Sequence, residues 1–167
     1  MFPQHDFKGL EQSKRYDWAT LFLGETYYDG TGCERDYEKA HEIFLFAAQN
    51  AADDRCAARA YYRAGYTYYA GVGNLIHLRE DRLLKRTYPN YDEYKALAVK
   101  CWKEAARLGF HLAEDWLADC YFFGEAVEKN LAEAKRLYKS AASKHLESSK
   151  KKLDERFPKT VRTTLKV

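Results

Sequence analysis

Apolar and small residues recur at intervals of four in three separate stretches of the chain. Each stretch has an alanine, a leucine or alanine four positions later, and a tyrosine four positions after that. The three sets are Ala19, Leu23 and Tyr27; Ala60, Ala64 and Tyr68; and Ala113, Leu117 and Tyr121. Residues four apart lie on one face of an α-helix, so each stretch predicts a helix with one apolar face and assigns its tyrosine to the core.

A second apolar pattern follows each of these stretches. Each copy has an alanine, an aromatic residue four positions after it, and two adjacent alanines seven and eight positions after it. The aromatic residues are Phe44, Trp102 and Tyr138. This pattern predicts a second helix that packs back on the first. A small residue beside the leucine or alanine of the first helix would permit close contact. These small residues are Gly24, Gly65 and Ala118.

The residues between the two patterns are typical of helix ends. A Gly-x-Gly pair at 30–32 and another at 71–73 predict that the first helix ends there, because glycine takes the left-handed cap conformation at little cost. Asp36 and Asn130 suit the start of the second helix, because their side chains accept hydrogen bonds from backbone amides. The unit is therefore a helical hairpin.

One hairpin cannot bury its own apolar face, so the hairpins must stack on one another. We therefore predict an all-α fold, an α/α solenoid of three helical-hairpin repeats with an N-terminal helix and a C-terminal capping helix. The predicted parts are a lead-in at 1–17, repeat 1 at 18–50, repeat 2 at 58–110, repeat 3 at 111–146, a capping helix at 147–157 and a tail at 158–167.

The repeated patterns resemble the Sel-one-like repeat family, a branch of the tetratricopeptide-type α-solenoids. The family pattern reads A-x-x-x-L-G-x-x-Y-x-x-G-x-G-V, then D-x-x-K-A-x-x-x-[FY]-x-x-A-A, and it covers roughly residues 18–146. The chain departs from it at Cys33 and Asn74 in place of valine, at Ala118 and Ala126 in place of glycine, and at Tyr94 in place of aspartate. The resemblance implies that the first helices line an inner curve and that the surface binds proteins.

A row of aromatic and acidic residues lies beside the signature face on the predicted first helices. The row consists of Glu25, Tyr28, Tyr62, Tyr66, Tyr69, Asp115, Asp119 and Phe122. Stacked on the inner curve, these residues would suit a peptide or protein loop that carries Lys or Arg, and tyrosines are frequent hot-spot residues. The alternative is that the rings only thicken the contact between hairpins.

The second repeat carries an insert of 17 residues at about 75–92, because its two patterns are 33 positions apart and those of the other repeats are 16 apart. Inserts in repeat arrays often lie on the binding face. The insert is therefore a second predicted binding surface, through its residues Arg79, Arg82, Lys85, Arg86, Tyr88 and Tyr91. The alternative is a longer hairpin whose leucines cover the stack.

Charge and cysteine content favour an intracellular protein. The net charge is +3, and residues 144–167 hold eight Lys or Arg against three Asp or Glu, which suits the polar outer face of a capping helix.

The four cysteines lie at irregular positions within the repeats and lack the spacing of a zinc site; they are Cys33, Cys56, Cys101 and Cys120. We therefore expect free thiols in a reducing compartment. With no apolar run for a signal peptide or a membrane span, the chain is predicted to be cytoplasmic.

We assign no catalytic, metal or cofactor motif to the chain; at the end of repeat 3, the residues Ser140, Ser143 and Lys144 miss the S-x-x-K spacing by one position. We predict a non-enzymatic adaptor or scaffold, a monomer or weak dimer, that binds a protein or peptide. An immunity protein that neutralises a toxin by direct binding is a narrower alternative. Two functions of other classes stay open: β-lactam-type hydrolysis, which the family resemblance suggests, and nucleic-acid binding through the basic insert and tail.

Overall fold

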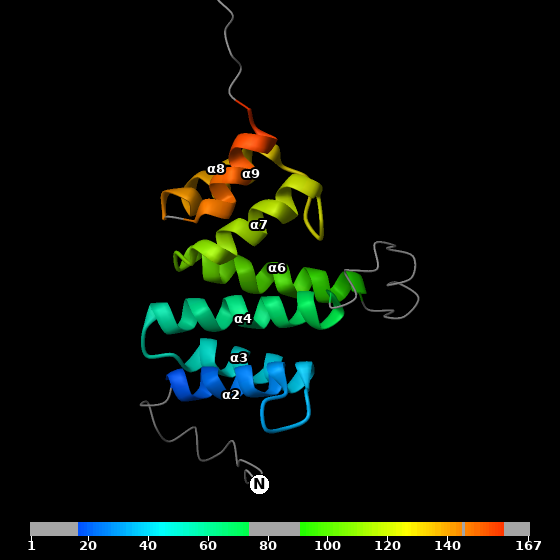
Figure 1. Ribbon diagram of the computed structural model, residues 1–167, viewed down its shortest axis with the longest axis vertical. Coiled ribbons are helices and arrows are strands. Elements are labelled where there is room, and N and C mark those ends of the chain that lie inside the picture. Colours follow the sequence, from blue (N-terminus) through cyan, green and yellow to red (C-terminus); the bar gives the residue numbers. More distant parts are fainter. Residues whose placement is uncertain (1–16, 74–90, 145, 159–167) are drawn as a thin grey trace, which may run out of the picture.

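The computed structural model describes residues 17–73, 91–144 and 146–158, and in these residues it contains seven α-helices and no strand. The helices are α2 (Asp17–Asp29), α3 (Tyr37–Asn50), α4 (Asp54–Gly73), α6 (Tyr91–Arg107), α7 (His111–Phe123), α8 (Leu131–Ser143) and α9 (Glu147–Arg156). Figure 1 shows them stacked in chain order from α2 to α9. The predicted all-α solenoid is confirmed; the predicted N-terminal helix lies outside the described residues.

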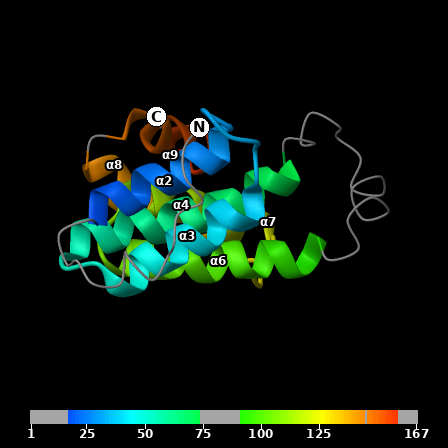
Figure 2. The ribbon, with the colours of Figure 1, turned by 90° about the horizontal axis from the view of Figure 1, so that it is seen from below.

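The helices pair as three hairpins, α2 with α3, α4 with α6, and α7 with α8, and α9 packs against α8. Viewed along the stack in Figure 2, α2 and α4 lie on one side, and α3 and α6 on the other. Phe44, Trp102 and Tyr138, the aromatic residues of the second helices, are the largest fully buried side chains. The core therefore follows the interface between the two layers of helices.

Glycine in the first helix lets the second helix approach closely. A Cβ atom at Gly24 would lie 2.5 Å from Cε1 of Phe44, and one at Gly65 would lie 2.6 Å from Nε1 of Trp102 and 2.9 Å from the Ala98 carbonyl oxygen. These distances are shorter than van der Waals contact. The aromatic ring of each second helix thus fills the space that the missing side chain leaves.

The predicted helix ends are confirmed in repeats 1 and 3. The side chains of Asp36 and Asn130 accept hydrogen bonds from the backbone amides of Lys39 and Glu133, at 2.9 and 3.0 Å. Gly30 and Gly32 follow the end of α2 and have positive φ values of 71° and 77°. In repeat 2, α4 ends at Gly73, the second glycine of the 71–73 pair, whereas α2 ends at Asp29, before the first glycine of its pair. Glycine lowers helix stability without forbidding a helix.

Ala126 occupies the second glycine position of repeat 3 and has a φ of 55°, in the left-handed region. A side chain there costs about 1 kcal/mol. We therefore expect Ala126→Gly to raise the free energy of unfolding by about 1 kcal/mol, measured by urea denaturation. Gly124→Ala, at a φ of 79° two positions earlier, is the matched control and should shift stability in the opposite direction. An Ala126→Gly variant less stable than the wild type would contradict this account.

The signature tyrosines belong to the core only in part. Tyr27, Tyr68 and Tyr121 are half-buried and pack at its margin. The ring of Tyr68 stacks on that of Tyr94, at 5.5 Å between centroids, and contacts the imidazole of His41 at 3.6 Å. The helix faces were thus predicted correctly, while the deepest positions belong to the aromatic residues of the second helices.

His41 is a buried histidine at the contact of α3 with α4. Its Nδ1–H donates to the Ala64 carbonyl oxygen at 3.0 Å, which leaves Nε2 buried without a hydrogen-bond partner. Burial lowers the pKa of His41 to about 4, against a smaller opposing effect of the Ala64 hydrogen bond. The folded protein therefore holds this side chain neutral.

We expect His41 to destabilise the fold in acid. Because its folded pKa lies below the ordinary value of about 6.5, the unfolded chain binds the proton first, and stability falls as the pH drops from about 6.5 towards 4. The expected loss at pH 5 is about 2 kcal/mol. Urea denaturation of the wild type and of His41→Gln at pH 7 and pH 5 isolates this contribution. Equal pH dependence of both proteins would show that His41 does not cause it.

Candidate protein-binding face

The first helices contact one another through positions that recur in each repeat, and we call the surface where they meet the inner side of the stack. Positions are counted from the first alanine of each repeat, which is Ala19, Ala60 or Ala113 and which we call the signature alanine. The residues two, six and nine positions after it form the forward row. The residue three positions after it is the backward residue. The forward rows are Leu21, Glu25 and Tyr28 on α2; Tyr62, Tyr66 and Tyr69 on α4; and Asp115, Asp119 and Phe122 on α7. The backward residues are Phe22, Arg63, Trp116 and Lys152.

The backward residue Lys152 belongs to α9, in which the interval of four residues seen in the first helices recurs. Ser149, Leu153 and Phe157 stand at the positions of the alanine, leucine and tyrosine, and Ser149 is fully buried like Ala60 and Ala113. The capping helix therefore has the residue pattern of the first helix of a hairpin. Sequence analysis missed this relation, although the spacing of four would have revealed it.

The junction between α2 and α4 is ionic. Glu25 Oε1 lies 3.3 Å from Nη2 of Arg59 and 3.6 Å from Nε of Arg63. The guanidinium of Arg63 also lies 4.9 Å from the ring centroid of Tyr28. Burial, and next the nearby Tyr66 hydroxyl, raises the pKa of Tyr28 to about 12. Glu25 and Tyr28 thus contact α4, the first helix of the next hairpin.

The junction between α4 and α7 is aromatic. The ring of Trp116 lies 5.8 Å from that of Tyr66 and 5.1 Å from that of Tyr69, between centroids. Tyr62 contacts Phe110 at 5.0 Å. Such edge and tilted contacts between rings are favourable beyond the area they bury. The tyrosine row of repeat 2 therefore serves in packing one hairpin on the next.

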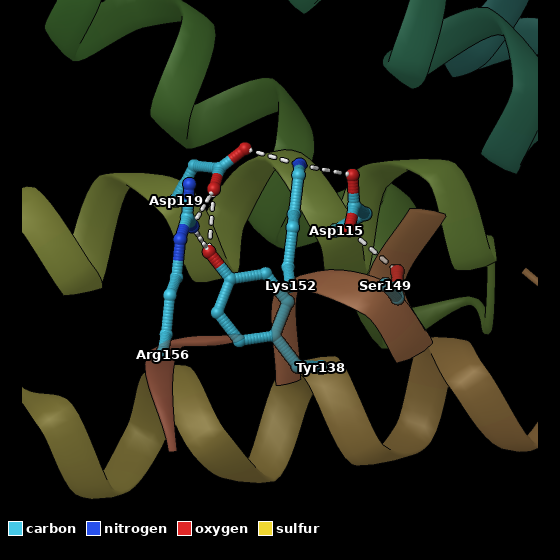
Figure 3. Close-up of polar contacts among 6 residues, drawn as sticks. All are labelled: Asp115, Asp119, Tyr138, Ser149, Lys152 and Arg156. Atoms are coloured by element: carbon cyan, nitrogen blue, oxygen red, sulfur yellow. Dashed lines mark hydrogen bonds and ion pairs between the residues drawn. The ribbon is translucent and has the colours of Figure 1, made fainter. Parts of the chain in front are cut away.

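The junction between α7 and α9 is a partly buried ionic network (Figure 3). Nζ of Lys152 lies 2.7 Å from Oδ2 of Asp115 and 2.6 Å from Oδ2 of Asp119. Asp115 also accepts a hydrogen bond from the Ser149 hydroxyl, and Asp119 accepts one from Arg156. The network thus joins α9 to the inner side of α7.

Tyr138 of α8 completes this network, because its hydroxyl donates to Asp119. Burial, followed by the hydrogen bond to Asp119, raises the pKa of Tyr138. Phe122, the aromatic end of the row, contacts Phe157 of the cap at 5.8 Å between centroids. The acids and the ring that α7 contributes to the predicted binding row are therefore covered by α9.

The structure brings together all eight predicted row residues on the inner side of the stack, and each of them takes part in contacts between helices. Of the predicted insert surface, Arg79, Arg82, Lys85, Arg86 and Tyr88 lie outside the described residues, while Tyr91 is the first residue of α6. Whether these residues bind a partner stays a prediction.

The α2 edge, which we define as Trp18, Ala19 and Phe22, is the part of the inner side that sequence analysis missed. Phe22 is 70% exposed and Trp18 is 53% exposed, although both are large apolar residues on α2. Ala19 is exposed as well, whereas the equivalent Ala60 and Ala113 are 0% exposed. The guanidinium of Arg59 lies 5.6 Å from the ring centroid of Trp18, which brings a cation to this edge.

The serines and the lysine near the S-x-x-K spacing stabilise the third hairpin. Oε1 of the buried Glu114 accepts hydrogen bonds from the Ser140 hydroxyl at 2.9 Å and from Nζ of Lys144 at 2.8 Å. The hydroxyl of Ser143 donates to the Ser140 carbonyl oxygen at 2.7 Å. These contacts tie the end of α8 to the start of α7.

The four cysteines are free thiols. Cys56, Cys101 and Cys120 are buried and Cys33 is exposed; burial raises the pKa of Cys101 to about 11. In the described part of the chain, no group of three His, Cys, Asp or Glu side chains is placed to hold a metal ion. None of the described helices is long and apolar enough to cross a membrane.

Two solved structures are similar to this chain over most of its length. One is a Sel1 repeat protein from Oxalobacter formigenes, with a TM-score of 0.61 and 26% sequence identity, covering 90% of this chain and 98% of that one. The other is a protective antigen present in uropathogenic Escherichia coli strains that displays an SLR fold, with a TM-score of 0.65 and 25% identity. That match covers 91% of this chain and 28% of the longer antigen. A comparison with curated proteins gave no match.

The family model of the Sel1 repeat matches residues 19–51, 58–77, 89–110 and 111–146. The second and third segments flank positions 78–88, which fall inside the predicted insert. Sel1 repeats generally act as scaffolds for protein–protein interaction and are typically not catalytic. The resemblance seen in the sequence is confirmed, and the chain belongs to the Sel1 repeat family.

Proposed function

We propose that this protein is a non-enzymatic interaction module that holds a protein partner on the inner side of the stack, at the α2 edge. The observation that carries the proposal is the exposure of Phe22 and Trp18 at the end of a surface whose other equivalent positions are covered. Large apolar side chains of this kind are costly to leave in water, and adjacent ones mark interaction sites.

A partner would gain most of its binding free energy from these two residues. Tryptophan is enriched among hot-spot residues, each of which typically contributes about 2 kcal/mol or more. Trp18 and Phe22 are four positions apart on α2 and so lie on one helical face. A single apolar segment of a partner can therefore contact both.

The charges near the α2 edge do not favour a basic partner. Glu25 is already paired with Arg59 and Arg63, and Asp115 and Asp119 are paired with the cap. The Arg59 side chain, which pairs with Glu25 and lies beside Trp18, is 47% exposed. We therefore propose a partner that presents apolar side chains, in place of the Lys or Arg that the sequence suggested.

The test is a comparative capture experiment with the full-length protein from the lysate of its own source. The wild type, the double variant Trp18→Ala/Phe22→Ala, and the control Phe123→Ala/Leu131→Ala serve as baits, the control removing two exposed apolar residues elsewhere. We expect a protein that the wild type and the control retain and the double variant loses, and direct titration of that purified protein should show at least a tenfold weaker affinity for the double variant. If every captured protein is retained equally by all three baits, the proposal is wrong.

The narrower role of an immunity protein stays a prediction. An immunity protein would use the same edge against a toxin, and the capture experiment would identify that toxin as the partner. β-Lactam hydrolysis, nucleic-acid binding, a cytoplasmic location and a monomeric or weakly dimeric state likewise stay predictions.

A further inference from the structure

We propose that the α2 edge binds an amphipathic α-helix of another polypeptide chain, and that this helix carries aromatic residues at i, i+4 and i+7 against Phe22. The inference rests on the proposed function and specifies the chemistry of the partner. Three junctions inside the chain support it, because they show what covers this same face elsewhere in the stack.

At each internal junction, the face equivalent to the α2 edge is covered by the preceding hairpin. The second helix of that hairpin packs against most of the face, and its first helix contacts the backward residue. The signature positions of α4, α7 and α9, which are Ala60, Ala113 and Ser149, are 0% exposed. Their counterpart Ala19 has an equally small side chain and is exposed. A small residue lets a neighbouring helix approach closely, because the distance between helix axes depends on the side chains at the contact. The face is thus shaped for a helix.

The residue types on the two sides of each junction also match. The backward residue Arg63 meets the acid Glu25, and the backward residue Lys152 meets the acids Asp115 and Asp119. The backward residue Trp116 instead meets two tyrosines of the α4 forward row. Cations therefore pair with an acidic forward row and an aromatic residue pairs with an aromatic one.

Phe22 is the backward residue of α2, and it is aromatic. By the same matching, the helix that covers it presents an aromatic forward row like that of α4. An acidic row like that of α7 would place carboxylates against a phenyl ring, where they lose water and gain no partner. The aromatic forward row of α4 and the acidic forward row of α7 can therefore be compared as peptides that should bind the α2 edge tightly and weakly, respectively.

The experiment measures binding of two labelled peptides to the full-length protein by fluorescence anisotropy. The aromatic peptide is residues 54–69 with Cys56→Ser, and the acidic peptide is residues 111–123 with Cys120→Ser. A side-chain staple on the face opposite the forward row holds each peptide helical. We expect the aromatic peptide to bind the wild type at least tenfold more tightly than the acidic one. Phe22→Ala should weaken the binding of the aromatic peptide at least tenfold.

A charge substitution provides the sharpest control. Phe22→Lys makes the α2 edge resemble α9, where Lys152 meets Asp115 and Asp119. It should reverse the preference, so that the acidic peptide binds more tightly than the aromatic one. Equal binding of both peptides to the wild type, or an unchanged preference in Phe22→Lys, would overturn the inference.

Two further outcomes would assign the edge to a different occupant and would also overturn the inference. One is a wild-type dimer in sedimentation that Phe22→Ala dissociates, which indicates a second copy of this chain. The other is a tenfold rise in peptide affinity after deletion of residues 1–16, which indicates that this segment already covers the edge.

The two proposals can fail separately. If a captured partner depends on Trp18 and Phe22 while neither peptide binds, the proposed function stands and the helical partner is wrong. If the aromatic peptide binds through Phe22 while no captured protein depends on the α2 edge, the proposed function is wrong and the preference of the edge for an aromatic helix stands.

Discussion

Trp102→Ala is expected to lower the free energy of unfolding by about 3–5 kcal/mol, the usual cost of removing a large buried aromatic side chain. Trp102 is 0% exposed, and its indole fills the space above Gly65. It also contacts Tyr69 and Trp116, at 5.3 and 5.4 Å between ring centroids, so it joins the second hairpin to the third. Alanine would leave a cavity where these elements meet.

The chain supplies a matched control for this prediction in Trp18, which is exposed at the α2 edge. Trp18→Ala should change stability by no more than about 0.5 kcal/mol, as surface substitutions usually do. Urea denaturation followed by circular dichroism measures both variants. Similar losses for the two tryptophans would contradict the assignment of one to the core and the other to a binding edge.

Lys152→Glu is expected to lower the free energy of unfolding by about 3 kcal/mol, because breaking a largely buried ion pair leaves uncompensated charge between α7 and α9. Lys152 bridges Asp115 and Asp119 from α9, and the Asp115 side chain is almost fully buried. Glutamate would place a third carboxylate at this point. We expect α9 to separate from α7 first, since these ionic contacts join the two helices.

Lys151→Glu is the control for this second prediction. The Lys151 side chain is exposed on the same helix and lies 3.9 Å from Glu155, in a surface pair that contributes little to stability. Hydrogen exchange should show faster exchange of α9 amides in Lys152→Glu and near wild-type exchange in Lys151→Glu. Equal effects of the two substitutions would show that the cap is held by general charge rather than by the network of Figure 3.

The periodic part of the structure could be predicted because its causes are local. Intervals of four residues define helix faces, and Asp36 and Asn130 cap the helices that follow them. Only the exact helix end differs between the repeats. The helix α2 ends at Asp29, before its glycine pair, and α4 ends at Gly73, the second glycine of its pair, so the residue type alone does not determine the last helical residue.

The binding site could be predicted only in part, because burial depends on which helix covers which face. Glu25, Asp115 and Asp119 have the composition of a recognition surface when read along the chain. Their partners lie far away in sequence: Arg59 is 34 residues from Glu25, and Lys152 is 37 residues from Asp115. Phe22, by contrast, has the appearance of an ordinary core residue and is exposed.

The sequence by itself determined that this protein is a stack of helical hairpins, which helix faces are apolar, and that Gly24 and Gly65 permit close packing. These properties follow from residue spacing and side-chain size within one repeat. The tertiary structure decided which of the remaining side chains are buried between repeats and which stay exposed at the α2 edge. The physical reason is that equivalent positions have equal geometry but unequal neighbours: stacking covers Ala60, Ala113 and Ser149 and leaves Ala19 exposed beside Trp18 and Phe22.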